Sequence, residues 1–324
     1  MSNASTAPSN AVELPSGWEM VVGLEVHVEL ATATKLFSAS PNRFGDPPNT
    51  NIDPVTLGLP GALPVLNRTA VELAMRLGLA LNCRVQRCTF HRKNYFYPDL
   101  PKAYQISQYD QPLNVDGWLD LPGDVRIGVE RAHLEEDTGK STHVGGSSGR
   151  IHGSDHSLVD FNRAGVPLVE IVSRPDIRTS DQARQYVTEL RSILLAVGAS
   201  DAKMEEGSMR VDVNVSVRRP GEPFGTRCEI KNVNSIRAIG RAIDTRPAGR
   251  STSSSRAAPC GRRRATGTTR RAARTRCARR RTRTTTGTSS SRTSSRWTRI
   301  RPGSRRCARR CRRSPRRGAC GSPS

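Results

Sequence analysis

Residues 22–30 alternate between apolar and polar side chains, and this alternation constrains the fold more than any other stretch of the chain. A β-strand turns successive side chains to opposite faces of its sheet. The apolar residues are Leu24, Val26, Val28 and Leu30, and the polar residues between them are Glu25, His27 and Glu29. The polar face could simply be solvated, or it could form a divalent-metal or acid/base surface.

Other strand-like segments also carry a carboxylate opposite apolar residues. Residues 166–172 are apolar except for Glu170, which would be costly to bury without a cation or a metal. The other such segments are residues 126–137, which end in an acidic turn, residues 211–217, with Asp212, and residues 228–232, with Glu229. Together they predict a mainly antiparallel sheet with one covered face and one acidic face. Mg²⁺ would relieve the repulsion, since it takes carboxylate oxygens and bridges nucleotide phosphates.

Three helices are expected to flank this sheet, which makes the fold class α+β. The first covers residues 69–81, with Thr69 and Glu72 in capping-box spacing. The second covers residues 179–197, is capped by Thr179 and Gln182, and stops at Gly198. The third begins after Ser235 and loses its pattern after Asp244.

The charge of the chain changes abruptly near residue 244. Residues 1–244 hold 26 Lys and Arg against 29 Asp and Glu, a net charge of −3, whereas residues 245–324 hold 26 Arg and no Lys, Asp or Glu. The only large apolar residues after 244 are Trp297 and Ile300, too few to offset the entropy of ordering the backbone. We therefore expect one folded domain at residues 18–244 and a disordered basic tail at residues 245–324.

The ends and cysteines indicate a soluble cytoplasmic protein. Residues 1–17 form an expected disordered lead with neither the basic start nor the apolar core of a secretory signal, and no run is long enough to span a membrane. The three cysteines of the body, Cys83, Cys88 and Cys228, are odd in number and do not indicate disulfides.

Residues 92–108 combine four aromatic side chains with cations. Such a segment could stack bases and hold phosphates, or it could be an edge strand whose Lys and Arg side chains extend to solvent. The residues alone do not decide between these interpretations.

Several long motifs closely resemble the B subunit of the aspartyl/glutamyl-tRNA amidotransferases, the GatB family. They are residues 22–27, 92–108, 133–137, 159–163 and 203–210 together with Asp212, and the resemblance covers about residues 18–244. It implies a glutamine synthetase-like catalytic cradle, here incomplete. It also implies a ligase that uses ATP and glutamine to convert mischarged Glu-tRNA(Gln) or Asp-tRNA(Asn) to the amidated form. The partners implied are the A and C subunits of the amidotransferase heterotrimer, of which the first is an amidase and the second braces the pair.

The resemblance also implies site residues. The metal and phosphate centre would use Glu25, His27, Glu136, Glu170, Asp212 and Glu229, of which the first four are also the expected catalytic residues. Glu135 could take the place of Glu136. Binding of ATP or of the tRNA acceptor end is expected at Arg92, Lys93, Tyr95 and Lys102. Mg²⁺ would neutralise and orient the γ-phosphate.

The chain departs from this family after residue 244, where the rest of the cradle and the tRNA-gripping domains should follow. One explanation is a natural basic arm for RNA. The other is a frameshift. Suppose that residues 284–296 were encoded by a suitable choice of synonymous codons. Translating the same DNA from one base upstream would then give Asp-Asp-Tyr-Arg-Tyr-Phe-Leu-Glu-Pro-Asp-Leu-Val-Pro, which resembles a further motif of the family. This favours an out-of-frame tail and an inactive product. The rival function is a non-enzymatic RNA-binding protein with a basic tail.

Overall fold

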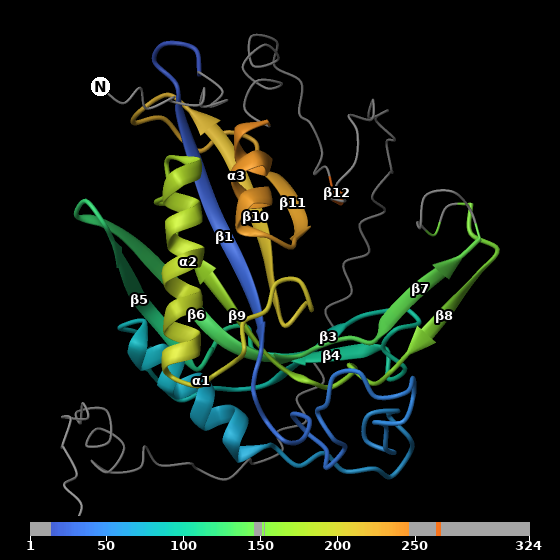
Figure 1. Cartoon of the computed structure of the whole chain (residues 1–324). Helices are drawn as coiled ribbons and strands as arrows, with labels where there is room; N and C mark the ends of the chain where they lie inside the picture. Colours follow the sequence, from blue (N-terminus) through green and yellow to red (C-terminus); the bar gives the residue numbers. More distant parts are fainter. Residues whose placement is uncertain (1–13, 146–150, 152, 246–263, 267–324) are drawn as a thin grey trace, which may run out of the picture. The chain divides into compact units, whose positions relative to one another are not determined.

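An eight-stranded sheet forms the centre of this computed structural model, which describes residues 14–145, 151, 153–245 and 264–266 (Figure 1). The strand order across the sheet is β12-β11-β10-β1-β9-β6-β5-β2. The strands are β1 (Glu19–Glu29), β2 (Arg84–Val85), β5 (Asn114–Leu121), β6 (Val125–Glu136), β9 (Pro167–Ser173), β10 (Met209–Arg218), β11 (Cys228–Val233) and β12 (Arg264–Thr266). Neighbouring strands run antiparallel except for β11 and β12, which run parallel. The expected α+β class with a mainly antiparallel sheet is confirmed.

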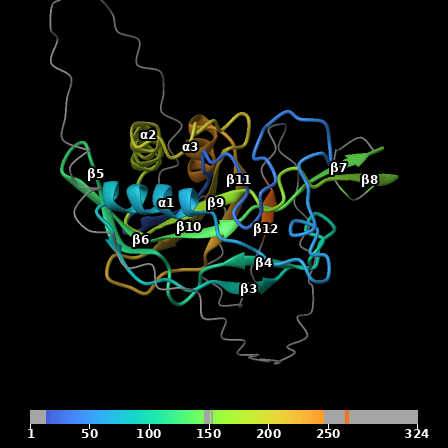
Figure 2. The same cartoon turned by 90° about the horizontal axis from the view of Figure 1, so that it is seen from below.

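The two faces of the sheet have different surroundings (Figure 2). Helices α1 (Arg68–Ala80), α2 (Ser180–Ala196) and α3 (Ile236–Asp244) lie on one face, and the hairpin of β3 (His91–Asn94) and β4 (Tyr104–Ser107) lies on the other. A second hairpin pairs β7 (Lys140–Val144) with β8 (His156–Asp160). The polar face of β1 is therefore turned away from the helices.

Strand β1 has the predicted alternation. Leu24, Val26 and Val28 are buried in the core, whereas Glu25 and His27 between them are only partly covered. The segment at residues 92–108 contains the hairpin β3–β4, in line with the strand interpretation, and Phe96 in its loop is exposed. Stacking of bases and binding of phosphates by this segment stay predictions.

The helix ends follow local capping chemistry. Thr179 caps α2 with the predicted capping box to Gln182. The expected cap at Thr69 is wrong: the side chain of Asn67 accepts hydrogen bonds from the N–H groups of Thr69 and Ala70, so α1 begins one residue earlier. Ser235 caps α3 as predicted.

The predicted disordered segments lie mostly outside the described residues. Residues 1–13, 246–263 and 267–324 are not described, so the lead at residues 1–17 and the tail at residues 245–324 stay predictions there. Within the tail, Arg264–Thr266 is described as strand β12, paired with β11. No helix within the described part of the chain is long and apolar enough to cross a membrane.

Replacing Leu24 by Ala tests the role of β1 in the core. Leu24 is buried, and its truncation should lower the free energy of unfolding by about 2–5 kcal/mol, through lost burial and a residual cavity. Leu79 lies exposed on α1, so Leu79→Ala should cost less than about 0.5 kcal/mol. Urea unfolding of both variants measures the difference, and equal losses would contradict the assignment of the two faces.

Candidate metal and nucleotide site

The register of the sheet brings distant side chains into one row on the face opposite the helices. Arg210 on β10 lies opposite His27 on β1, His27 lies opposite Glu170 on β9, and Glu170 lies opposite His133 on β6. Side chains that lie directly opposite on neighbouring antiparallel strands are close and share a face. Strand pairing alone therefore gathers two imidazoles, a carboxylate and a guanidinium.

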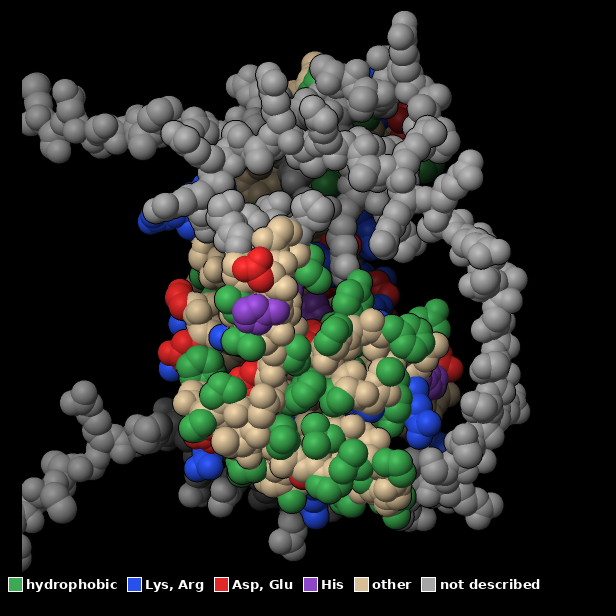
Figure 3. Space-filling view, turned by 90° about the vertical axis from the view of Figure 1, so that its right-hand side faces the viewer, with side chains coloured by type: hydrophobic (Ala, Val, Ile, Leu, Met, Phe, Trp, Pro, Cys, Tyr) green, Lys and Arg blue, Asp and Glu red, His purple; other side chains and the backbone are tan. Residues whose placement is uncertain are grey.

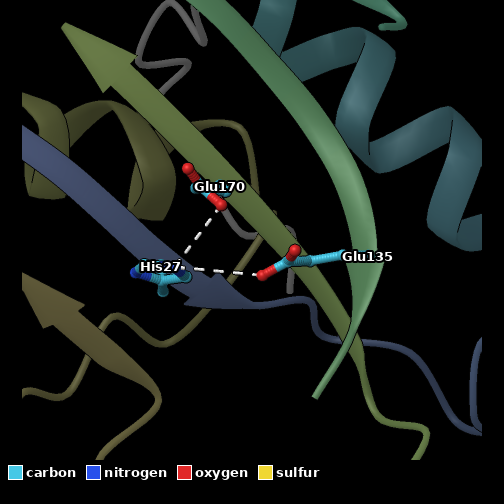
Figure 4. A group of neighbouring side chains, drawn as sticks. All are labelled: His27, Glu135 and Glu170. Atoms are coloured by element: carbon cyan, nitrogen blue, oxygen red, sulfur yellow. Dashed lines mark ion pairs between the residues drawn. The ribbon is translucent and has the colours of Figure 1, made fainter. Parts of the chain in front are cut away.

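The first ligand cluster consists of His27, Glu135 and Glu170, whose side chains point toward one another from β1, β6 and β9 (Figure 4). The Nε2 atom of His27 is 3.6 Å from a Glu170 oxygen and 3.8 Å from a Glu135 oxygen. One ligand atom from each residue lies within 4.8 Å of the others. His133 adds a second imidazole at 3.6 Å and 3.8 Å from the same two carboxylates.

Charge compensation shifts the pKa values in this cluster. Burial alone would lower the pKa of His27, but the hydrogen bond and charge of Glu170 outweigh it and raise that pKa above 6.5. Burial alone would raise the pKa of Glu170, but the hydrogen bond from His27 and the charges of His133, His27 and Arg131 lower it to about 2. The cluster therefore presents an ionised carboxylate at neutral pH.

The second ligand cluster consists of Glu25, Asp212 and Glu229, with one oxygen from each within 4.8 Å of the others. The side-chain amide of Asn214 donates to Glu25 at 2.9 Å. The ammonium of Lys231 lies 3.0 Å from an oxygen of Asp212 and 2.7 Å from an oxygen of Glu229. This cluster therefore already holds a positive charge supplied by the chain.

The first cluster, together with Glu25 and Asp212 of the second, lines one cavity of about 790 Å³. Arg92, Lys93 and Tyr95 from the β3–β4 segment line the same cavity, and their role in binding ATP or the tRNA acceptor end stays a prediction. The guanidinium of Arg92 also packs 4.9 Å from the centre of the Tyr104 ring. Carboxylates and cations thus share one cavity, which suits a metal together with an anion such as a phosphate.

Glu136 and Lys102, two of the predicted site residues, do not line this cavity. They form an ion pair with each other, both side chains are almost fully buried, and the N–H of Ile106 donates to Glu136 at 3.2 Å. The reason is the alternation along β6, which places Glu135 on the same face as His133 and turns Glu136 to the other. The structure therefore brings Glu135, the alternative left open by the sequence, beside His27 and Glu170.

Sequence reasoning missed several residues that line the cavity. They are Arg131, His133, Arg210 and Lys231. Arg210 shares strand parity with Asp212, and Lys231 shares it with Glu229. Arg131 and His133 share it with Glu135, the alternative to the predicted Glu136. The carboxylate of Asp137 accepts a hydrogen bond from the guanidinium of Arg210 at 2.5 Å and so holds Arg210 in place. Although burial of Asp137 would raise its pKa, the charges of Arg210 and Arg163 lower it. Burial and the charge of Asp137 raise the pKa of neighbouring Glu29 to about 7.

Adjacent residues on β6 offer a matched test of the first cluster. Glu135→Gln should weaken binding of Mn²⁺ by at least about tenfold, since it removes a charged ligand. Glu136→Gln should leave Mn²⁺ affinity unchanged, although it breaks the buried pair with Lys102 and lowers stability. Isothermal titration of both folded variants measures this. Weaker binding by Glu136→Gln alone would reverse the assignment.

Comparison with known proteins gives a consistent family. A family model described as the GatB/GatE catalytic domain matches residues 20–299. Proteins named as the B subunit of aspartyl/glutamyl-tRNA(Asn/Gln) amidotransferase are similar over most of the chain. The protein of Salinispora arenicola is 60% identical over 239 residues, which are 71% of this chain and 48% of that protein. The protein of Frankia casuarinae is 55% identical over 254 residues, which are 74% of this chain and 50% of that protein.

The protein of Kineococcus radiotolerans is 57% identical over 248 residues, 71% of this chain and 49% of that protein. The chain thus spans about half the length of these curated relatives. The family model matches well over half of the chain, in agreement with the resemblance of its motifs. This chain belongs to the GatB/GatE catalytic domain family.

Proposed function

We propose that this chain carries the ATP-dependent centre of a tRNA-dependent amidotransferase. In the first step a side-chain carboxylate oxygen of Glu-tRNA(Gln) or Asp-tRNA(Asn) attacks the γ-phosphorus of ATP, and ADP leaves. Ammonia then attacks the acyl carbon, and phosphate leaves to give Gln-tRNA or Asn-tRNA. The observation that carries the proposal is that the first ligand cluster, and Glu25 and Asp212 of the second, share one cavity with cationic side chains. The names of the curated relatives support the same class of reaction.

The residues of both clusters fit Mg²⁺, or Mn²⁺ as its probe. Carboxylate oxygens suit these hard cations, an imidazole is an accepted ligand of Mn²⁺, and each set of ligand atoms is close enough to serve one ion. His27, Glu135 and Glu170 would hold one ion, and the second cluster would hold another. When bound, the ions would neutralise the phosphate charge and favour in-line attack.

The chain's own cations would bind and orient the nucleotide. Arg92 and Lys93 line the cavity from the hairpin, so they can hold phosphate oxygens opposite the carboxylates. The hydroxyl of Tyr95 donates to Asp99 at 3.2 Å, and burial together with Asp99 raises the Tyr95 pKa to about 12. This hydroxyl therefore stays neutral, and we assign Tyr95 to packing and orientation of the substrate.

We also assign one face of the protein to a partner protein. Hydrophobic side chains gather on the side that carries the loop between β1 and α1 (Figure 3). In that loop Phe44, Leu63 and Val65 are largely exposed. Contiguous apolar surface of this kind marks protein interaction sites. The expected partner is the amidase of the complex, which releases ammonia from glutamine and is braced by a third, small protein. Crosslinking from this loop would test it.

The first prediction concerns ATP. In a version of the protein with the family's reading frame restored, Glu25→Ala and Asp212→Ala should abolish Mg²⁺-dependent activation, because each removes a ligand of the second cluster. Glu189→Ala, on the exposed side of α2, is the matched control and should keep normal rates. Ammonia-dependent amidation of Glu-tRNA measures all three, and near wild-type rates for Glu25→Ala would remove it from the centre.

The second prediction concerns the 324-residue chain as it stands. Mixed with the amidase and the small bracing protein, it should bind tRNA only in a salt-sensitive, unselective way, because 26 arginines after residue 244 attract phosphates without placing the acceptor end. It should form no Gln-tRNA. Glutamine-dependent conversion of Glu-tRNA by this chain would show that it is a working enzyme. Sequencing the DNA around codon 244 would test directly whether the tail is out of frame.

A further inference from the structure

The ammonium of Lys231 supplies the positive charge that balances the carboxylates of the second cluster. Its ammonium contacts an oxygen of Asp212 and an oxygen of Glu229, which are two of the three carboxylates in that cluster. Its side chain is one-quarter exposed and lines the cavity. The ammonium therefore neutralises the carboxylates from the side on which a nucleotide would bind.

Two of the three carboxylates, Asp212 and Glu25, accept hydrogen bonds from other groups that would remain in place if Lys231 moved. The N–H of Asn232 donates to the second oxygen of Asp212 at 2.8 Å. Asn232 has a backbone φ of +56°, and the pairing of β10 with β11 shifts register between Val211 and Val213. A left-handed non-glycine residue beside a bulge is a local irregularity, and here it directs an N–H at Asp212.

The opposite side of the cluster is fixed in the same way. Asn214 lies opposite Glu229 in the strand register, and its amide donates to Glu25 at 2.9 Å. The Oδ1 atom of Asn214 is buried and has no hydrogen-bond partner among the described residues. The cluster thus keeps an unused oxygen beside Glu25, and the ammonium of Lys231 is held, among the described residues, by the two ion pairs that a metal would replace.

The two clusters differ in what a divalent ion must displace. In the first cluster His27 is itself a ligand type for Mn²⁺, so an ion can bind while the imidazole stays in place. In the second cluster an ion and the Lys231 ammonium would compete for the same oxygens, because a metal requires direct contact at about 2.0–2.1 Å. The flexible four-carbon stem of a lysine allows its ammonium to leave.

We propose that Lys231 is an exchangeable counter-ion which a divalent metal displaces from the second cluster, and that the displaced ammonium binds a phosphate of the nucleotide. This inference rests on the proposed function of the cavity. It makes Lys231 a positioning residue that couples the second metal to the nucleotide. By thermodynamic linkage, the second metal should then strengthen binding of the nucleotide, and the nucleotide should strengthen binding of the second metal. Without nucleotide, the second cluster should bind metal weakly.

Titration of the full 324-residue chain with Mn²⁺, followed by electron paramagnetic resonance, tests the exchange. Lys231→Met removes the competing charge and keeps a long side chain, so it should strengthen the second Mn²⁺ binding step by about tenfold or more without nucleotide. Lys140→Met is the matched control, because Lys140 on β7 is exposed, lies outside the cavity lining and forms no ion pair within the described residues. It should change the second step far less.

A nonhydrolysable ATP analogue tests the coupling. It should strengthen the second Mn²⁺ step in the wild-type chain, and this strengthening should largely disappear in Lys231→Met. A purely structural role for Lys231 would not remove this dependence on the nucleotide. Should Lys231→Met fail to fold, Lys231→Arg keeps the charge, and its bidentate guanidinium should weaken the second step relative to wild type.

The outcomes separate the two proposals. Unchanged or weaker second-step binding in folded Lys231→Met, or an unchanged effect of the analogue, would overturn the exchange while leaving the proposed function intact. If Lys231→Arg bound the second Mn²⁺ as tightly as the wild-type chain does, the proposed exchange would be overturned as well. Absence of any Mn²⁺ or analogue binding to the wild-type chain would contradict the proposed function and this inference together.

Discussion

The repulsion among carboxylates on one face of a sheet is the constraint on which this structure depends. β1 lies between β10 and β9, and its register places Glu25 opposite Asp212 and His27 opposite Glu170. Such a face is stable only if cations balance it. The chain supplies imidazoles at the first cluster and Lys231 at the second. At the first cluster the imidazoles lower the pKa of Glu170, so this carboxylate is ionised where it lines the cavity.

The opposite face of the same strands makes that concentration of charge tolerable. Leu24, Val26 and Val28 pack with the three helices in one continuous core. Burial of this apolar face stabilises the sheet independently of the polar one. A shift of one residue in the register of β1 would exchange the two faces, so the position of every site residue on β1 depends on the same core.

Periodicity in the sequence predicted β1, β6, β9, β10 and β11, the three helices and the polar face of β1, because alternation is a local property. It could not by itself choose between Glu135 and Glu136, since both end an acidic strand and the choice depends on where β6 pairs with β9. Lys102 was assigned to the site from the resemblance to the family, yet the fold buries it against Glu136. The contribution of His133 and Lys231 depends on pairing between strands far apart in the chain, which one sequence does not specify.

The proposed function requires one cavity, on the face of the sheet opposite the helices, to hold two metal ions and a nucleotide. Crystals of the chain grown with Mn²⁺ and a nonhydrolysable ATP analogue would test it most directly, through the anomalous scattering of manganese. One anomalous peak is expected among His27, Glu135 and Glu170, and a second among Glu25, Asp212 and Glu229. Peaks elsewhere, or a nucleotide bound outside this cavity, would contradict it.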